Sequence, residues 1–135
     1  MRVEGRCYCG ALRYAAEGQP LFKGQCHCRE CQYLSGGMPN VVMGMPASGF
    51  VWTQGKPKEF RRSDLADAVT REFCAECGTH ITTRTPKLAG AVLVKVGTFD
   101  DPSVFGTPQM AIFTCDKQPF HVIPSGMPAF DRLPG

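Results

Sequence analysis

The sequence predicts a mostly β fold with one or two short helical pieces. The chain holds 15 glycines and 11 prolines in 135 residues, a composition that favours short strands and turns over long helices. Its apolar runs are short, and Gly or Pro separates them. There is no internal repeat, low-complexity tract or linker, and the length suits one folding unit, so we expect residues 1–135 to form a single domain.

Six apolar runs are expected to form strands because they are bounded by turn residues or rich in β-branched side chains. In chain order they are residues 12–16, 41–45, 50–53, 81–85, 92–96 and 110–114. The clearest is 92–96, a valine-rich run that ends at Gly97, and the last is bounded by Pro108 and by Asp116 with Lys117.

One stretch has the signals of a short helix. It covers Arg29–Leu34 and ends at Ser35-Gly36-Gly37, where consecutive glycines stop a helix. Residues 119–135 are rich in Pro and Gly, and we expect them to form an irregular tail over the domain.

Eight cysteines are the unusual feature of the composition. A secreted chain uses cysteines for disulfides, whereas a chain in a reducing compartment uses them to bind metal. The opening residues MRVEGRC lack the apolar stretch of a secretory signal, and no segment has the length of a membrane span. We therefore expect a cytoplasmic protein with no membrane partner, whose thiols bind metal.

The formal net charge of +3 treats every cysteine as a neutral thiol. Seven thiolates that hold two zinc ions would bring this charge to zero. The Lys and Arg residues are also scattered along the chain, with Arg61-Arg62 as the densest pair. Nucleic-acid binding is therefore not expected.

Four cysteines have the spacing of a closed zinc site, and we name them the quartet: Cys7, Cys9, Cys74 and Cys77. A Cys-x-x-Cys-Gly turn points both of its sulfurs at one centre, and the earlier pair also precedes a glycine. Four sulfurs at about 2.3 Å would complete a tetrahedron around zinc. This structural site would stabilise the fold by joining the N-terminal hairpin to the middle of the chain.

Three further cysteines, the trio of Cys26, Cys28 and Cys31, lie close together in the sequence without an obvious fourth ligand. Three protein ligands with one exchangeable position are typical of a zinc ion that binds or activates a ligand. Thiolate ligands suit a thiol-bearing guest, and the metal would keep its thiol deprotonated near neutral pH. We therefore expect the trio to be the catalytic site.

Other interpretations of the cysteines stay open at this point. The quartet could consist of buried or disulfide-bonded cysteines. The trio could be a second structural zinc site completed by Cys115, His80 or His27, which would suit a zinc-stabilised module that binds a protein partner. It could also be the reactive cluster of a thiol redox or metal sensor. Cys115 is most simply a small buried hydrophobic residue.

Three motifs occur in order along the chain: CYCGALRY at 7–14, CHCREC at 26–31 with Ser35-Gly36, and FCAECGT at 73–79. Together they resemble the opening hairpin, central cluster and late knuckle of the glutathione-dependent formaldehyde-activating enzyme (GFA) family, also called the CENP-V/GFA domain. The tail is similar to the ending of this family at Lys117, Pro119-Phe120, 124–128 and Phe130. The resemblance covers nearly the whole length.

The resemblance implies an Mss4-like β-tent of short antiparallel sheets around a structural zinc ion. In this family the quartet matches the structural zinc ligands, and the trio matches the second zinc site. The named activity handles the adduct of glutathione and formaldehyde and is classed as a carbon–sulfur lyase acting in reverse. The implied partners are therefore a small thiol such as glutathione and an aldehyde.

The chain departs from the family pattern near its end. Where many members carry His before the apolar pair of a late strand, it has Ala111-Ile112-Phe113, and Phe120 stands where Trp is common. Cys115 is an extra thiol in the same region. These changes leave the metal ligands intact and concern the substrate pocket. Candidates to meet the carboxylates of a glutathione-like guest are Arg13, Arg29, Arg71 and Arg84.

Overall fold

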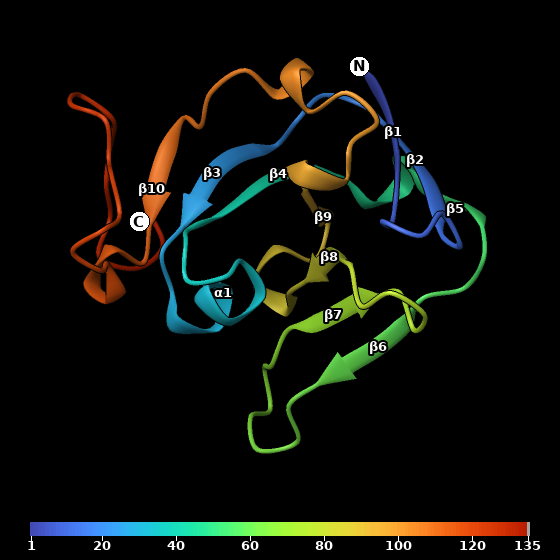
Figure 1. The fold of residues 1–135 in the computed structure, drawn as a ribbon. Helices are drawn as coiled ribbons and strands as arrows, with labels where there is room; N and C mark the ends of the chain where they lie inside the picture. The colour runs from blue at the N-terminus through green and yellow to red at the C-terminus, as the bar shows by residue number, and fades with distance from the viewer. Residues whose placement is uncertain (135) are drawn as a thin grey trace.

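A computed structural model describes residues 1–134 and arranges the strands in two sheets (Figure 1). The smaller sheet has the order β1-β2-β5, with bounds Arg2–Arg6, Arg13–Glu17 and Phe50–Gln54. Its first two strands form an antiparallel hairpin in which Arg2 is paired with Glu17. Alternate residues of β1 are buried, as expected for a strand with one face on the core.

The larger sheet has the order β10-β3-β4-β9-β8-β7-β6. In chain order its strands are β3 (Phe22–Cys26), β4 (Asn40–Pro46), β6 (Lys58–Arg61), β7 (Thr70–Phe73), β8 (His80–Arg84), β9 (Ala91–Lys95) and β10 (Met110–Ile112). All neighbours in it are antiparallel except β10, which runs parallel to β3. A parallel pair needs a long crossover, and most of the chain separates β3 from β10.

The single α-helix in the described residues, α1 (Arg29–Leu34), lies between β3 and β4. Short 3-10 turns connect other elements, at Ala47–Gly49, Pro86–Leu88, Val96–Thr98, Pro102–Phe105 and Thr114–Asp116. Within residues 1–134, none of the helices has both the length and the apolar character needed to cross a bilayer.

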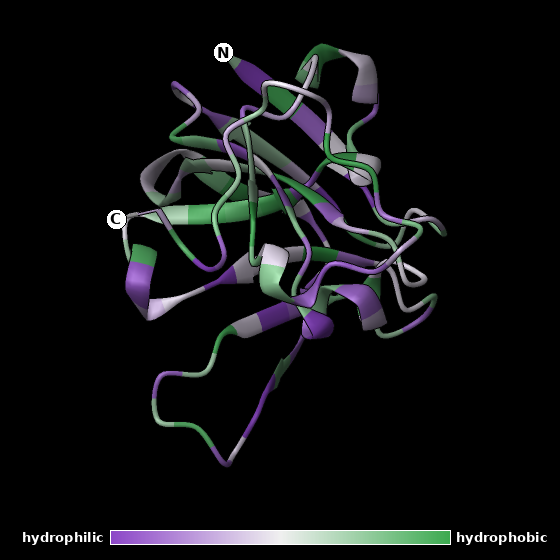
Figure 2. Cartoon of the chain, turned by 90° about the vertical axis from the view of Figure 1, so that its left-hand side faces the viewer, coloured by the Kyte–Doolittle hydropathy of each residue, from purple (hydrophilic) through white to green (hydrophobic). Residues whose placement is uncertain are grey.

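The main hydrophobic core lies between the two sheets. Tyr14 of the small sheet packs with Met43, Ile81 and Val94 of the large sheet, and all four side chains are fully buried. Figure 2 shows apolar residues concentrated on the central strands, whereas the loop after β6 projects from the body of the molecule with mixed colouring. A second, smaller cluster surrounds Cys26, Cys31 and Ile112.

The mostly β prediction is confirmed, and the helix has the predicted bounds. All six predicted strands are present, but the last ends early because Phe113 adopts a left-handed backbone conformation, with φ of 54°, that breaks the strand. None of the six predicted ranges covers β1, β3, β6 or β7. Charged residues interrupt β1, β6 and β7, β6 is exposed along its whole length, and β3 contains a lysine, a glycine and a glutamine among its five residues, so none of the four forms an apolar run.

Candidate metal centres

The quartet brings together two parts of the chain that are distant in sequence. Cys7 follows β1, and Cys74 follows β7. The Sγ atom of Cys9 lies 3.6 Å from that of Cys7 and 3.7 Å from that of Cys74, and all four sulfurs lie within 4.8 Å of one another. Bonds of about 2.3 Å in a tetrahedron would place the sulfurs about 3.8 Å apart, so this donor set fits zinc.

Local backbone turns hold these sulfurs in place. The backbone N–H of Leu12 donates to Cys7 Sγ at 3.2 Å, and that of Glu76 donates to Cys74 Sγ at 3.4 Å. Gly78 closes the late knuckle with φ of 78°, a conformation that glycine adopts without strain. A hydrogen bond from the Thr79 hydroxyl lowers the pKa of Cys77 to about 5, which favours the thiolate that a metal requires.

The trio is positioned by the end of one strand and the start of the helix. Cys26 ends β3, where its neighbours are Asn40 on β4 and Ile112 on β10. Cys28 caps the N-terminus of α1, because its Sγ accepts a hydrogen bond from the N–H of Cys31 at 3.3 Å. The three sulfurs lie within 4.8 Å of one another, so the structure places all three predicted residues together.

Hydrogen bonds within the trio favour the thiolate form of Cys31. Hydrogen bonds from the thiols of Cys26 and Cys28 hold the pKa of Cys31 well below its usual range, whereas the interaction with Cys28 raises the pKa of Cys26. The side-chain amide of Asn40 also donates to Cys31 Sγ, at 3.6 Å. Lys95 lowers the pKa of Cys31 further through its positive charge.

Apolar side chains and a buried amide surround the trio. Ile112, Phe113 and Phe130 pack against it, so the departure from the family pattern at 111–113 lies next to the sulfurs. Gln32 of α1 is buried and donates to two backbone carbonyls, those of His27 at 2.8 Å and Asp116 at 2.9 Å. This side chain therefore joins the helix to the loop before it and to the turn after β10.

The structure places the three candidate fourth ligands outside the trio's sulfur cluster. Both ring nitrogens of the buried His27 lie at hydrogen-bonding distance from other side chains, 2.9 Å from His121 Nδ1 and 3.0 Å from Gln25 Nε2. His80 stacks on Phe73 at a centroid distance of 5.1 Å. None of the eight cysteines forms a disulfide. Cys115 is exposed, so the prediction that it is buried was wrong: it lies on a 3-10 turn at the protein surface.

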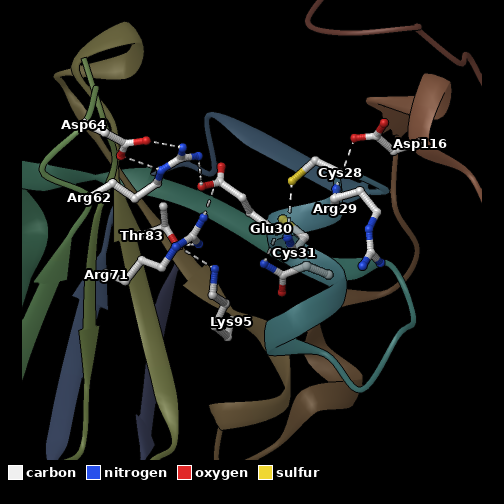
Figure 3. Close-up of polar contacts among 11 residues, drawn as sticks. Cys28, Arg29, Glu30, Cys31, Arg62, Asp64, Arg71, Thr83, Lys95 and Asp116 are labelled. Atoms are coloured by element: carbon white, nitrogen blue, oxygen red, sulfur yellow. Dashed lines mark hydrogen bonds and ion pairs between the residues drawn. The ribbon is translucent and has the colours of Figure 1, made fainter. Parts of the chain in front are cut away.

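Two cavities lie next to helix α1, and none of the trio's cysteines is among the residues that line them. The larger, of about 400 Å³, is lined by residues that include Asn40 and Lys95, and the smaller, of about 350 Å³, by residues that include Glu30 and Arg71. Figure 3 shows these charged side chains next to the helix that carries Cys31.

Among the arginines proposed from sequence to meet a carboxylate, only Arg71 lines one of these two cavities. Arg13 pairs with Asp100 and Arg84 with Glu72, each at 2.8 Å. The Arg29 guanidinium lies over the ring of an exposed tyrosine, 4.9 Å from its centroid. Arg13 and Arg84 therefore have acidic partners that line neither cavity, whereas Arg29 contacts Tyr33, a residue of the smaller cavity's lining.

Sequence reasoning missed Asn40 and Lys95 as members of this site. Lys95 did carry a signal in the sequence, because it directly follows the apolar run 91–94; the structure adds that its side chain is buried. Asn40 carried none, since a single polar residue before a strand is unremarkable. Its role depends on the pairing of β4 with β3, which places it opposite Cys26.

The fold and these clusters define a mostly β protein with two candidate metal centres, one with four sulfur donors and one with three. The sequence profile of the family described as glutathione-dependent formaldehyde-activating enzyme matches residues 2–116. The chain therefore belongs to this family.

A crystal structure of a Rhodobacter sphaeroides protein has a similar fold, with a TM-score of 0.61 and 18% sequence identity over 78% of this chain and 96% of that one. No curated protein matches the sequence.

Proposed function

We propose that this protein is a zinc-dependent enzyme of the carbon–sulfur lyase type, which acts on the adduct of a small thiol and an aldehyde, such as S-(hydroxymethyl)glutathione. The observation that carries the proposal is the trio. It offers three sulfurs within 4.8 Å of one another, and within residues 1–134 no fourth His, Cys, Asp or Glu ligand atom joins the group. The family match supports the same class of substrate.

The proposed reaction joins or separates a thiol and formaldehyde. In the joining direction the thiol sulfur bonds to the carbonyl carbon, the C=O double bond becomes a C–O single bond, and the proton of the thiol ends on the new hydroxyl. Zinc held by Cys26, Cys28 and Cys31 would supply a centre that keeps the incoming thiol deprotonated near neutral pH.

The chain's own residues have supporting roles in this proposal. Asn40 orients Cys31 through the hydrogen bond to its sulfur. Ile112 and Phe130 limit access of water to the trio from the side of the tail. The adjoining cavities offer space for the remainder of the thiol compound. Because the uncatalysed condensation is itself feasible, binding and orientation of the adduct would form a large part of the catalysis.

The direct test compares zinc-loaded wild-type protein with Cys28→Ser. The rate of exchange between glutathione, formaldehyde and their adduct can be measured by NMR exchange spectroscopy. We expect wild type to exceed the buffer rate and Cys28→Ser to approach it. The matched control is Cys115→Ser, which removes an exposed thiol outside both clusters and is expected to keep the wild-type rate.

Equal rates for wild type, Cys28→Ser and buffer would remove the catalytic claim. The protein would then be better described as a zinc-stabilised module without catalysis. A zinc count per chain, repeated with excess glutathione, complements this test: two equivalents are expected, and one would mean that the trio does not hold zinc.

A further inference from the structure

Two buried cations lie beside the trio and share one neutral hydroxyl group. Lys95 and Arg71 are each 8% exposed. Lys95 Nζ donates to Thr83 Oγ1 at 2.6 Å, and Arg71 Nη1 donates to the same oxygen at 3.5 Å (Figure 3). Burial, together with the charge of Arg71, lowers the pKa of Lys95 to about 8. Positive charge is therefore concentrated at a point where water is largely excluded.

Nearby carboxylates reach Arg71 but not Lys95. Glu30 lies 3.7 Å from Arg71 and 3.3 Å from Arg62, and Arg62 also pairs with Asp64 at 2.7 Å, so Glu30 is the carboxylate available to Arg71. Its side chain is 48% exposed, which weakens both interactions. Among the described residues, no carboxylate forms an ion pair with Lys95.

The trio is the other source of negative charge that acts on Lys95. The charge of Cys31 raises the pKa of Lys95 and opposes the effect of burial. Three thiolates around a divalent ion would carry one net negative charge. Among the described residues the Lys95 ammonium donates one hydrogen bond, to Thr83, so its other N–H groups are available to a ligand oxygen.

The two cavities give a ligand access to these groups. Lys95 lines the larger cavity and Arg71 the smaller one, while His80 and Leu34 line both. The buried Nδ1 of His80 has no hydrogen-bond partner. Asn40 lines the larger cavity and donates to Cys31 Sγ, so one side chain spans the distance from cavity wall to trio.

We propose that these adjoining cavities bind a carboxylate group of the thiol substrate, with Lys95 and Arg71 as its cationic partners and His80 as a further polar contact. The substrate class is therefore a thiol that carries a carboxylate a few bonds from its sulfur. A guanidinium and an ammonium together suit this group, since both donate charge-assisted hydrogen bonds to carboxylate oxygens. The inference rests on the proposed function, because it places the thiol at the trio.

The test uses cobalt-loaded protein, in which thiol binding at the metal changes the visible absorption. Two probes of similar size differ in charge: 3-mercaptopropionate carries a carboxylate, and 2-mercaptoethanol carries a hydroxyl group. We expect 3-mercaptopropionate to bind at least about tenfold more tightly than 2-mercaptoethanol. This ratio of affinities is typical of one charge-assisted hydrogen bond. Lys95→Met and Arg71→Met should each reduce this ratio and leave the affinity for 2-mercaptoethanol within about twofold of wild type.

Two further variants separate charge from structure. Lys95→Arg keeps the positive charge and should keep part of the preference. Lys87→Met removes an exposed lysine that lines neither cavity, and it should keep the wild-type ratio. A wild-type ratio near one, or a folded Lys95→Met protein with the wild-type ratio, would overturn the carboxylate site.

Propionate distinguishes failure of this site from failure of the proposed function. It has the carboxylate but no thiol, and its binding to zinc-loaded protein can be followed by amide NMR shifts. Shifts centred on Asn40, His80 and Lys95 that vanish in Lys95→Met would support the carboxylate site. If neither thiol changed the cobalt spectrum while these shifts were present, the proposed function would be contradicted and the carboxylate site would stand. Absence of these shifts in wild type would overturn the site.

Discussion

At the scale of single residues, Tyr14 shows how the core constrains a polar group. Its ring is fully buried, and its hydroxyl lies 2.7 Å from Thr98 Oγ1. The Thr98 hydroxyl donates its own proton to the carbonyl of Lys95, so Tyr14 is the donor in this pair. Burial raises the pKa of Tyr14 above its usual value, because the charged phenolate would lose its hydration.

This shift predicts a specific dependence of stability on pH. Above about pH 10, Tyr14 ionises in the unfolded chain but keeps its proton in the folded protein. The unfolded state then binds fewer protons, so the free energy of unfolding should fall by up to about 1.4 kcal/mol per pH unit from this group.

Tyr14→Phe should lack that part of the decline, at a cost of about 1 kcal/mol at neutral pH for the lost hydrogen bond. Urea unfolding of both proteins from pH 8 to 11 measures the difference. Lys95, whose pKa is lowered to about 8, gives an opposite slope between pH 8 and 10.5, but that slope is common to both proteins. Parallel pH curves would show that Tyr14 is not the group responsible.

At the scale of elements, helix α1 has only six residues, too few to be stable alone. Its position depends on contacts to other segments. The backbone N–H of Arg29 donates to Asp116 Oδ2 at 3.1 Å, and Gln32 donates to the carbonyls of His27 and Asp116. These bonds hold the helix, and with it two of the three trio sulfurs, against the turn that follows β10.

Replacing Gln32 should therefore disturb the trio more than the fold. Gln32→Met keeps the side-chain length but removes the donor to one buried carbonyl, of His27, and one partly buried carbonyl, of Asp116, which should lower the free energy of unfolding by about 1–3 kcal/mol. Metal affinity at the trio should fall, as measured by competition with a chromogenic chelator.

The control is Tyr33→Ala on the exposed face of the same helix, at a side chain that is 79% exposed. This substitution should change both quantities little. Equal losses in the two variants would show that the helix, and not the buried amide, sets the geometry of the trio.

At the scale of the whole molecule, the quartet and the trio differ in how much of the fold packs around them. Cys7 and Cys74 belong to the main core between the sheets, and the contact between Cys9 and Cys74 joins segments 65 residues apart. Cys26 and Cys31 belong to the smaller cluster beside β10. Metal at the quartet should therefore stabilise the global fold, whereas metal at the trio should affect a local region.

Chelation should separate the two sites. The trio offers three sulfurs and the quartet four, so a chelator should remove the trio's metal first and leave the far-UV circular dichroism unchanged. Removal of the second equivalent should unfold the protein.

Cys74→Ser should mimic the second step, and Cys28→Ser the first. Zinc release and circular dichroism, recorded together, test the order. Simultaneous loss of both equivalents with unfolding would contradict this division of roles, as would a metal-free protein that keeps its full structure.

Local spacing along the chain was enough to identify several features. The Cys-x-x-Cys-Gly turn, the three closely spaced cysteines of the trio and the end of α1 at Ser35 all depend on residues a few positions apart. The mostly β character also followed from composition and short apolar runs. Short-range geometry governs these features, so they can be read without knowledge of the fold.

Only the tertiary structure decided which distant groups meet. The parallel pairing of β10 with β3, the buried contact of His27 with His121, and the convergence of Lys95 and Arg71 on Thr83 depend on sheet register and on packing between remote segments. In a strand, a shift of one residue moves a side chain to the opposite face, so no local pattern specifies these encounters. Spacing in the sequence determined which cysteines are candidate metal ligands, and packing determined what surrounds them.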